Sequence, residues 1–354
     1  MFQILTLNPQ AFGFDLSDLS LKICELKRRG NNILVSSFGE WPLPQGLMEQ
    51  GEVKKEDELA KFIKSSLSQV QGQPLSTKYV ITSLPEEKAF LQVIQLPRMR
   101  AEEVPSAVQF QAENYIPYPI ETVYLDSQII SPIQDHLDHL DVLLAALSKT
   151  TVDSYVSTIQ KAGLIPKILE IESLAVSRAL IEQERTPDPV LIIDLGAVRT
   201  GFIVFAGSSV RLTASAPVSS EQFTQAIVKS LQVDSKTADK LKKEYGVERE
   251  QKRQGIQVFE ALIPPLTDLI EQIQKYLRYY ETHALHQHLP QDERNIAKIL
   301  LCGGGANLKG LPEFLTKELK IETSVGNPWV NILQFPLKQV PPLTWQNPLV
   351  IPLP

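Results

Sequence analysis

The sequence predicts an α/β protein with two lobes of related design, and the prediction depends on three stretches of chain. FGFDLSDLSLKICEL at 12–26 and LIIDLGAVRTGFIVF at 191–205 each contain an apolar strand ending in Asp, a tight turn and a second apolar strand. ILLCGGGANLKGL at 299–311 places three glycines after another apolar strand. Two similar hairpins about one domain apart, followed by a glycine turn, indicate a duplicated fold with a phosphate-binding cleft between its halves.

Length and composition agree with two lobes and exclude several classes of protein. A chain of 354 residues exceeds what one hydrophobic core usually serves. The net charge of -6, without a clustered basic tract, argues against nucleic acid as a partner. The two cysteines, Cys24 and Cys302, lie in apolar runs, which favours buried thiols in a reducing cytoplasm over a disulfide or a metal site. No apolar run approaches the ~20 residues needed to cross a bilayer, so we expect no direct membrane insertion.

The first lobe is expected to span 1–185. Apolar residues separated by turn residues predict strands at 12–16, 19–27, 31–39 and 79–83, and helical spacing of apolar residues predicts a helix at 56–70. Strands at 89–96 and 124–130 around a helix at 101–115 predict a small α+β insertion at about 85–135, followed by an exposed polar connection at 135–141. A strand at 141–147, a helix at 151–162, a strand at 165–171 and a helix at 173–184 would then return to the lobe.

The second lobe, 186–354, repeats this plan. TPDP at 186–189 predicts a hinge between the lobes. Strands at 190–194, 200–206 and 209–215 would form a second three-stranded unit, and helices at 220–231, 235–245 and 258–288 would form a helical subdomain at about 216–295.

The candidate binding residues lie in the turns. Asp15 and Asp194, each at a strand end, are suited to hold Mg²⁺ through water. Turn amides and hydroxyls would receive phosphate oxygens, and glycines would let the backbone approach the ligand. The remaining residues expected around phosphate or base are Ser17, Lys22, Gly196, Thr200, Gly303, Gly304 and Gly305. A single Asp at a strand end is most often a turn former, but the order and spacing of the three motifs favour a site.

The chain resembles the PilM family, actin-like proteins of the type IV pilus inner-membrane platform that are related to the cell-division protein FtsA. The most specific part of the resemblance is 83–130, and within it QAENYIPYPIE at 111–121. AGLIPKILEIESLAVSRAL at 162–180 resembles the family's crossover helix, with Glu172 at its start facing the nucleotide. The resemblance implies an actin-like (ribonuclease H-like) fold that binds ATP and Mg²⁺, with Asp239 and Lys242 contacting the nucleoside.

The sequence also departs from the family pattern. Ser17 replaces the glycine of the first turn, and Ser219 and Ser220 stand where a glycine pair is usual. Ala197 occupies the position of a second acid in actin, which leaves Glu172 as the residue that would orient a water for hydrolysis. We therefore expect nucleotide binding with slow or absent turnover.

The function implied by the resemblance is that of a cytoplasmic scaffold. Such a scaffold would capture the N-terminal tail of a PilN-like membrane protein and so lie at the inner membrane through its partner. Contacts with a pilus ATPase and a homodimer are further expectations. Two alternatives remain open: a sugar-kinase-like phosphotransferase, which needs a catalytic Asp for which only Asp18 and Asp126 are candidates, and an FtsA-like polymer-forming ATPase.

Overall fold

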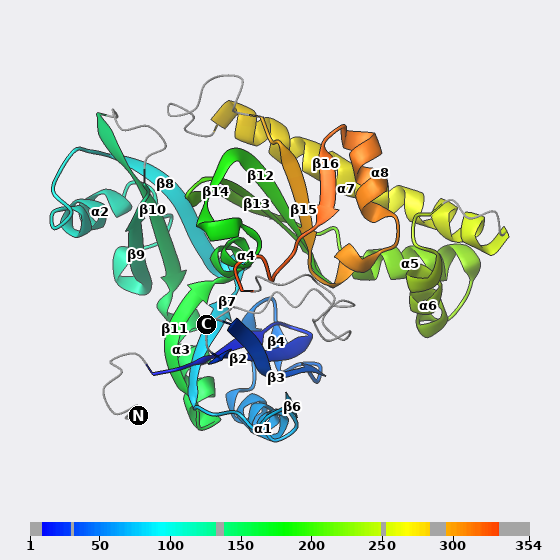
Figure 1. The fold of residues 1–354 in the computed structure, drawn as a ribbon, viewed down its shortest axis with the longest axis horizontal. Helices are drawn as coiled ribbons and strands as arrows, with labels where there is room; N and C mark the ends of the chain where they lie inside the picture. The colour runs from blue at the N-terminus through cyan, green and yellow to red at the C-terminus, as the bar shows by residue number, and fades with distance from the viewer. Residues whose placement is uncertain (1–8, 30–31, 132–137, 249–252, 284–294, 333–354) are drawn as a thin grey trace.

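The two largest sheets of the described chain share one strand plan (Figure 1). The computed structural model describes residues 9–29, 32–131, 138–248, 253–283 and 295–332. The first sheet has the order β3-β2-β1-β7-β11, with a short β6 (Gln71–Gly72) beside β3; its main strands are β1 (Phe12–Leu16), β2 (Ser20–Arg29), β3 (Asn32–Pro42), β7 (Tyr79–Leu84) and β11 (Ile165–Ile171). The second has the order β14-β13-β12-β15-β16; its strands are β12 (Thr186–Leu195), β13 (Thr200–Gly207), β14 (Ser209–Ala216), β15 (Lys298–Cys302) and β16 (Glu322–Val325).

The strand directions repeat as well as the order. In each sheet the first three strands form an antiparallel meander, and two further strands add in parallel on its far side. The predicted duplication of the two lobes is therefore confirmed. Because β1 and β12 are central strands, the turns that follow them occupy equivalent places in the two lobes.

The central strand of the second sheet is buried on both faces, which explains its continuous apolar sequence. Leu191 and Ile193 pack into a core with the helices that cover one face. Val190 and Ile192 face the other side and pack against α4 (Glu172–Leu180). A strand covered on both faces needs an apolar run instead of strict alternation.

Helices of the first lobe cover its sheet and connect it to the second lobe. α1 (Glu56–Leu67) and α3 (Lys149–Lys161) lie against each other, and buried residues of both belong to the core of the first sheet. α4 follows β11 directly, but Val176 and Leu180 pack against second-lobe strands. In Figure 1 this helix lies between the two sheets, so the crossover helix forms part of the joint between the lobes.

The inserted subdomain is a three-stranded antiparallel sheet of order β8-β10-β9 with one helix. Its elements are β8 (Ala89–Pro97), α2 (Val104–Ala112), β9 (Val123–Ile129) and β10 (His139–Ser148). The predicted boundary near 135 is too early, because β10 is the middle strand of this sheet and extends the subdomain to Ser148. Alternate residues of β10, including Val142 and Leu144, pack with α2, which accounts for its apolar sequence.

The second lobe carries the expected helical subdomain, formed by α5 (Ser220–Leu231), α6 (Ser235–Tyr245) and α7 (Arg253–His283); α8 (Leu311–Leu319) connects β15 to β16. The segment predicted as a hinge, 186–189, lies instead at the start of β12. Its two prolines coincide with a shift of register between Thr186 and Val190, because proline cannot donate to the strand ladder. Across the described ranges, none of the helices combines the length and apolar composition that crossing a bilayer requires.

Candidate functional site

Asp15 lies near the end of β1, and its carboxylate contacts one residue from each of the two neighbouring strands. Asp15 is buried, and its Oδ1 accepts a hydrogen bond of 2.6 Å from Ser83 Oγ on the parallel strand β7. Its Oδ2 lies 3.2 Å from Lys22 Nζ on the antiparallel strand β2. Burial alone would lower the pKa of Lys22, but the charges of Asp15 and Glu40 raise it above its ordinary value. Asp15 and Lys22 therefore form a charged pair at the mouth of the first lobe.

The β1–β2 turn is held by its own side chains. Ser17 Oγ accepts from the backbone N–H of Ser20 at 3.2 Å. The carboxylate of Asp18 accepts from the backbone N–H groups of Gln50 and Gly51, at 2.8 and 2.9 Å. Ser17, at the position where the family usually has glycine, thus places a hydrogen-bonding hydroxyl in this turn. Asp18 connects the turn to the hairpin of β4 (Met48–Glu49) and β5 (Glu52–Val53).

The second turn and the glycine turn meet at Asp194. Gly196 donates its N–H to Arg199 O at 3.0 Å, and a Cβ at Gly196 would lie 2.7 Å from that oxygen. Gly303 has φ +77, and a Cβ there would clash with the Asp194 carboxylate. A Cβ at Gly304 would have no heavy atom within 4 Å, so this position borders open space. Gly196 and Gly303 are therefore needed for the backbone fold, whereas Gly304 leaves room for a ligand.

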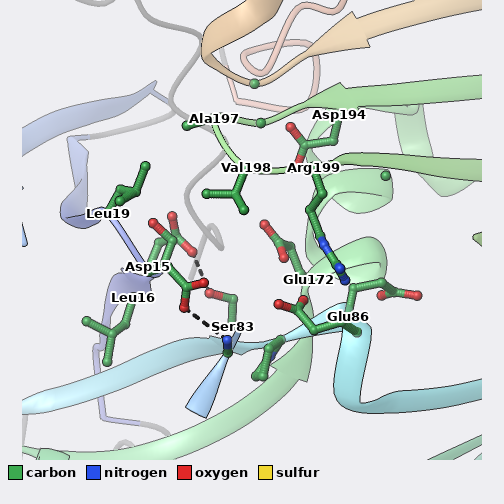
Figure 2. Close-up of a pocket in the computed structure, with 18 of the residues that line it drawn as sticks. Asp15, Leu16, Leu19, Ser83, Glu86, Glu172, Asp194, Ala197, Val198 and Arg199 are labelled. Carbon is green, nitrogen blue, oxygen red and sulfur yellow. Dashed lines mark hydrogen bonds between the residues drawn. The ribbon is translucent and has the colours of Figure 1, made fainter. Parts of the chain in front are cut away.

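A cavity of about 670 Å³ lies between the lobes, and both aspartates line it (Figure 2). Asp15 and Asp194 thus face one cleft, as the sequence predicts. The other predicted residues that line this cavity are Ser17, Lys22, Glu172, Gly196, Gly303 and Gly304.

Four predicted residues do not line the cavity. Thr200 is fully buried, and its hydroxyl donates to Val218 O at 2.7 Å. Lys242 is buried against α5, where Nζ donates to Thr224 Oγ1 at 2.6 Å, and it pairs with Asp239 at 3.2 Å. Gly305 is packed against Leu195. Lys242 Nζ also donates a hydrogen bond to Ser220 Oγ on α5. Ser220 stands at a position where the family has glycine.

The cavity concentrates carboxyl groups in a buried setting. Burial, opposed by Lys22 and reinforced by Asp15, raises the pKa of Asp194 to about 6. Burial together with the charges of Asp194 and Asp15 raises the pKa of Glu172 well above its ordinary value. Burial also raises the pKa of Glu86. Carboxyl groups with such raised pKa values are concentrated at functional sites, where a cation or ligand can relieve their repulsion.

Sequence reasoning missed Arg199, Glu86 and Ser83 in this cavity. Arg199 lies within the second turn motif itself, and a basic residue in a turn expected to receive phosphate was a usable signal. Glu86 and Ser83 belong to the stretch that carries the family resemblance, Ser83 as the last residue of a predicted strand of the first lobe and Glu86 within the predicted insertion. Both lie at its junction with β7, where the chain borders the cleft.

The donor set fits a nucleotide with a hydrated metal ion. The cavity is in the range of small-molecule sites. Lys22 and the turn amides are suited to phosphate, and Gly304 borders space that a base or sugar would occupy. Among the residues that the structure describes, no three acidic, histidine or cysteine side chains are grouped to ligate one ion. Carboxylates such as those of Asp15 and Asp194 are suited to hold Mg²⁺ through its water ligands.

The repeated sheets and the cleft between them define a two-lobed, actin-like protein. The family model described as type IV pilus assembly protein PilM matches residues 13–341, so the chain belongs to this family. The family and fold class predicted from the sequence are thereby confirmed.

Solved structures and a curated relative agree with this assignment. A chain of the PilM-PilN type IV pilus biogenesis complex has a TM-score of 0.75 and 27% identity, covering 96% of this chain and 94% of that one. MreB5 of Spiroplasma citri bound to ADP, at 12% identity and a TM-score of 0.52, covers 90% of this chain and 92% of that one and supports the fold alone. Cell division protein FtsA of Neisseria meningitidis serogroup B is 23% identical over 199 residues, which are 51% of this chain and 46% of that protein. The match thus spans about half the length of this relative.

Proposed function

We propose that this protein is a cytoplasmic, actin-like scaffold of the type IV pilus inner-membrane platform. It binds ATP with Mg²⁺ between its lobes and captures the N-terminal tail of a PilN-like membrane protein, through which it stays at the membrane. The observation that carries the proposal is the cavity in which Asp15, Asp194 and the Gly303–Gly304 turn come together. The solved PilM-PilN complex gives the class of partner.

Nucleotide binding joins the two lobes in this proposal. Asp15 and Lys22 come from the first lobe, whereas Asp194 and Gly304 come from the second, so one ligand contacts both. Asp15 and Asp194 would hold Mg²⁺, which would supply positive charge against the phosphates. Burial and the neighbouring carboxylates raise the pKa of Glu172, which favours its protonated form, and a protonated carboxyl cannot accept a proton from an attacking water. Slow or absent hydrolysis follows, which suits a scaffold better than a kinase.

The inserted subdomain offers a surface for an extended tail. β9 is an edge strand of the three-stranded sheet, and an extended peptide can add to such an edge. Phe110 and Tyr118 are 78% and 58% exposed, and Tyr124 on β9 is 49% exposed. Tyr124 OH also donates to Asp153 on α3 at 3.0 Å, so this surface continues from the insertion onto the first lobe. Aromatic side chains beside an edge strand suit the apolar side chains of a tail.

The test measures both ligands on the full chain. Calorimetry should show binding of Mg²⁺-ATP and, separately, of a synthetic peptide with the cytoplasmic N-terminal sequence of a PilN-like protein from the same organism. Phe110→Ser should weaken peptide binding without changing the melting temperature, because its ring is exposed. A scrambled peptide is the control. If neither ligand binds, the proposed function is wrong; substrate-dependent ATP loss in a sugar screen would favour the kinase instead.

A further inference from the structure

Arg199 is a positively charged residue of the cavity, and within the described chain its guanidinium forms no ion pair with an acidic residue. Of the described residues, seven acidic ones line the cavity, Asp15, Asp18, Glu40, Glu86, Glu87, Glu172 and Asp194, but only two basic ones, Lys22 and Arg199. Lys22 is already paired with Asp15. Within the described ranges, no hydrogen bond or ion pair engages the guanidinium of Arg199, although its backbone is fixed.

The backbone of the β12–β13 turn aims this side chain. Arg199 O accepts from Gly196 N–H at 3.0 Å, and Gly196 O in turn accepts from Ser220 N–H at 3.0 Å at the start of α5. The turn is thus anchored to the helical subdomain. Figure 2 shows the Arg199 side chain leaving the turn and pointing toward Glu172 and Glu86, across the cleft from the second lobe.

The position of Arg199 indicates which end of a bound nucleotide this residue would contact. Gly303 lies against Asp194, and Gly304, also in the second lobe, borders open space that would take the base or sugar in the proposed function. Arg199 points the other way, to Glu86 in the segment after β7 of the first lobe and to Glu172 at the start of α4. A triphosphate that starts at the glycine turn and passes Asp194 would end beside this guanidinium.

We propose that Arg199 binds the terminal phosphate of a nucleoside triphosphate and thereby makes the cleft prefer triphosphate over diphosphate. This inference rests on the proposed function and names the residue that distinguishes the two nucleotides. A guanidinium donates paired N–H groups that match phosphate oxygens, and such charge-assisted bonds are stronger than neutral ones. The closed first turn, with Ser17 and Asp18 committed to the chain, increases the need for a donor from the second lobe.

Charge balance gives the same result. The ionised members of this acidic set would repel a triphosphate, and Lys22 is engaged by one of them, Asp15. Mg²⁺ between Asp15 and Asp194 would neutralise the inner phosphates, which leaves the charge at the far end to Arg199. The alternative role for Arg199 is to offset the charge of Glu86 and Glu172 across the cleft, and that role would not distinguish ATP from ADP.

The experiment compares the triphosphate analogue AMPPNP with ADP, each with Mg²⁺, by calorimetry on the full chain. Arg199→Gln should weaken AMPPNP binding about tenfold or more and ADP binding less than about threefold. Arg199→Lys should retain part of the preference, because it keeps the charge but loses the paired donors. Arg100→Gln is the control, since Arg100 is an exposed residue of the inserted subdomain that pairs with Glu103.

The outcomes separate this inference from the proposed function. If wild type binds both nucleotides and Arg199→Gln weakens both equally or neither, the inference is wrong and nucleotide binding stands. If wild type binds neither nucleotide, nucleotide binding fails and the role of Arg199 fails with it. Retained preference in Arg199→Gln with lost preference in Arg100→Gln would also overturn the assignment.

Discussion

At the scale of single residues, Asp194 is kept in a setting that opposes its charge. Burial raises its pKa from 3.8 to about 6, so the folded protein keeps this proton over a range in which the unfolded chain has released it. Stability due to this group is therefore present below about pH 4, is lost as the pH rises to about 6, and changes little above that. Asp194→Asn should remove this loss and stabilise the protein at pH 8 by at most about 3 kcal/mol.

Denaturant unfolding of both proteins at pH 4 and pH 8 checks this prediction. The gain should appear at pH 8 and shrink at pH 4, and the Mg²⁺-ATP thermal shift should disappear in Asp194→Asn. Asp188→Asn, an exposed carboxylate on the same strand, is the matched control. A loss of stability at pH 8 would mean that Asp194 is structural.

The glycine turn separates folding from binding in two adjacent residues. Gly304→Val should leave the melting temperature of the free protein nearly unchanged, because its side chain would enter open space, but it should abolish the thermal shift with Mg²⁺-ATP. Gly303→Ala should lower stability by about 1–3 kcal/mol, because φ is +77 and a Cβ would meet Asp194. Thermal melts with and without nucleotide measure both. Equal nucleotide shifts in wild type and Gly304→Val would place the ligand elsewhere.

The turn residues also show what local sequence can predict about a site. Asp15 and Asp194 were found because each ends an apolar strand in a repeated pattern, and central strands of equivalent sheets bring their ends to one cleft. Thr200 was assigned by its spacing from Asp194 and Lys242 by resemblance to the family. Their partners Val218 and Thr224 come from segments that local sequence does not place beside them. Arg199 was missed because the direction of a long side chain depends on the lobe that faces it.

At the scale of elements, strand patterns predicted the sheets well but not every boundary. The apolar run in β10 looks the same whether it joins the lobe or the inserted subdomain, and only its pairing with β8 and β9 decides between them. The connection before it was expected to be exposed and polar. Residues 132–137 lie outside the described ranges, but the His139 side chain is 14% exposed and Asp141 is buried.

Asp141 matters because it joins two elements that sequence reasoning treated separately. Its Oδ2 lies 2.7 Å from Arg211 Nη1 on β14, and both side chains are largely buried. Asp141→Leu should therefore cost about 3–5 kcal/mol, because it leaves a buried guanidinium without its charge partner. Asp141→Leu with Arg211→Met should recover most of the loss. A double-mutant cycle from denaturant unfolding measures the coupling, and additive effects of the two changes would show that the pair is not coupled.

At the scale of the whole molecule, the same ion pair connects the proposed binding surfaces. Arg211 belongs to the second lobe, which contributes Asp194 and Arg199 to the cleft, and Asp141 belongs to the subdomain that carries Tyr124 and the β9 edge. Ser208 Oγ also donates to Ser131 O at 3.2 Å across this joint. A nucleotide that draws the lobes together would act on the inserted subdomain through these contacts.

Thermodynamic linkage then requires each ligand to change the affinity of the protein for the other by the same factor. If Mg²⁺-AMPPNP changes the dissociation constant of the PilN-like tail peptide by a factor, the peptide must change that of AMPPNP by the same factor. We expect a factor of about five or more in wild type, in the usual range for coupled sites. In Asp141→Leu with Arg211→Met, each ligand should bind alone with nearly normal affinity, but the factor should fall below about two. Calorimetry in both orders of addition measures it, with Arg100→Gln as a control that leaves the joint intact. A factor of one in wild type would mean that the cleft and the tail surface are independent. An unchanged factor in the double variant would locate the coupling in α4 instead, because Val176 and Leu180 of this helix also connect the lobes.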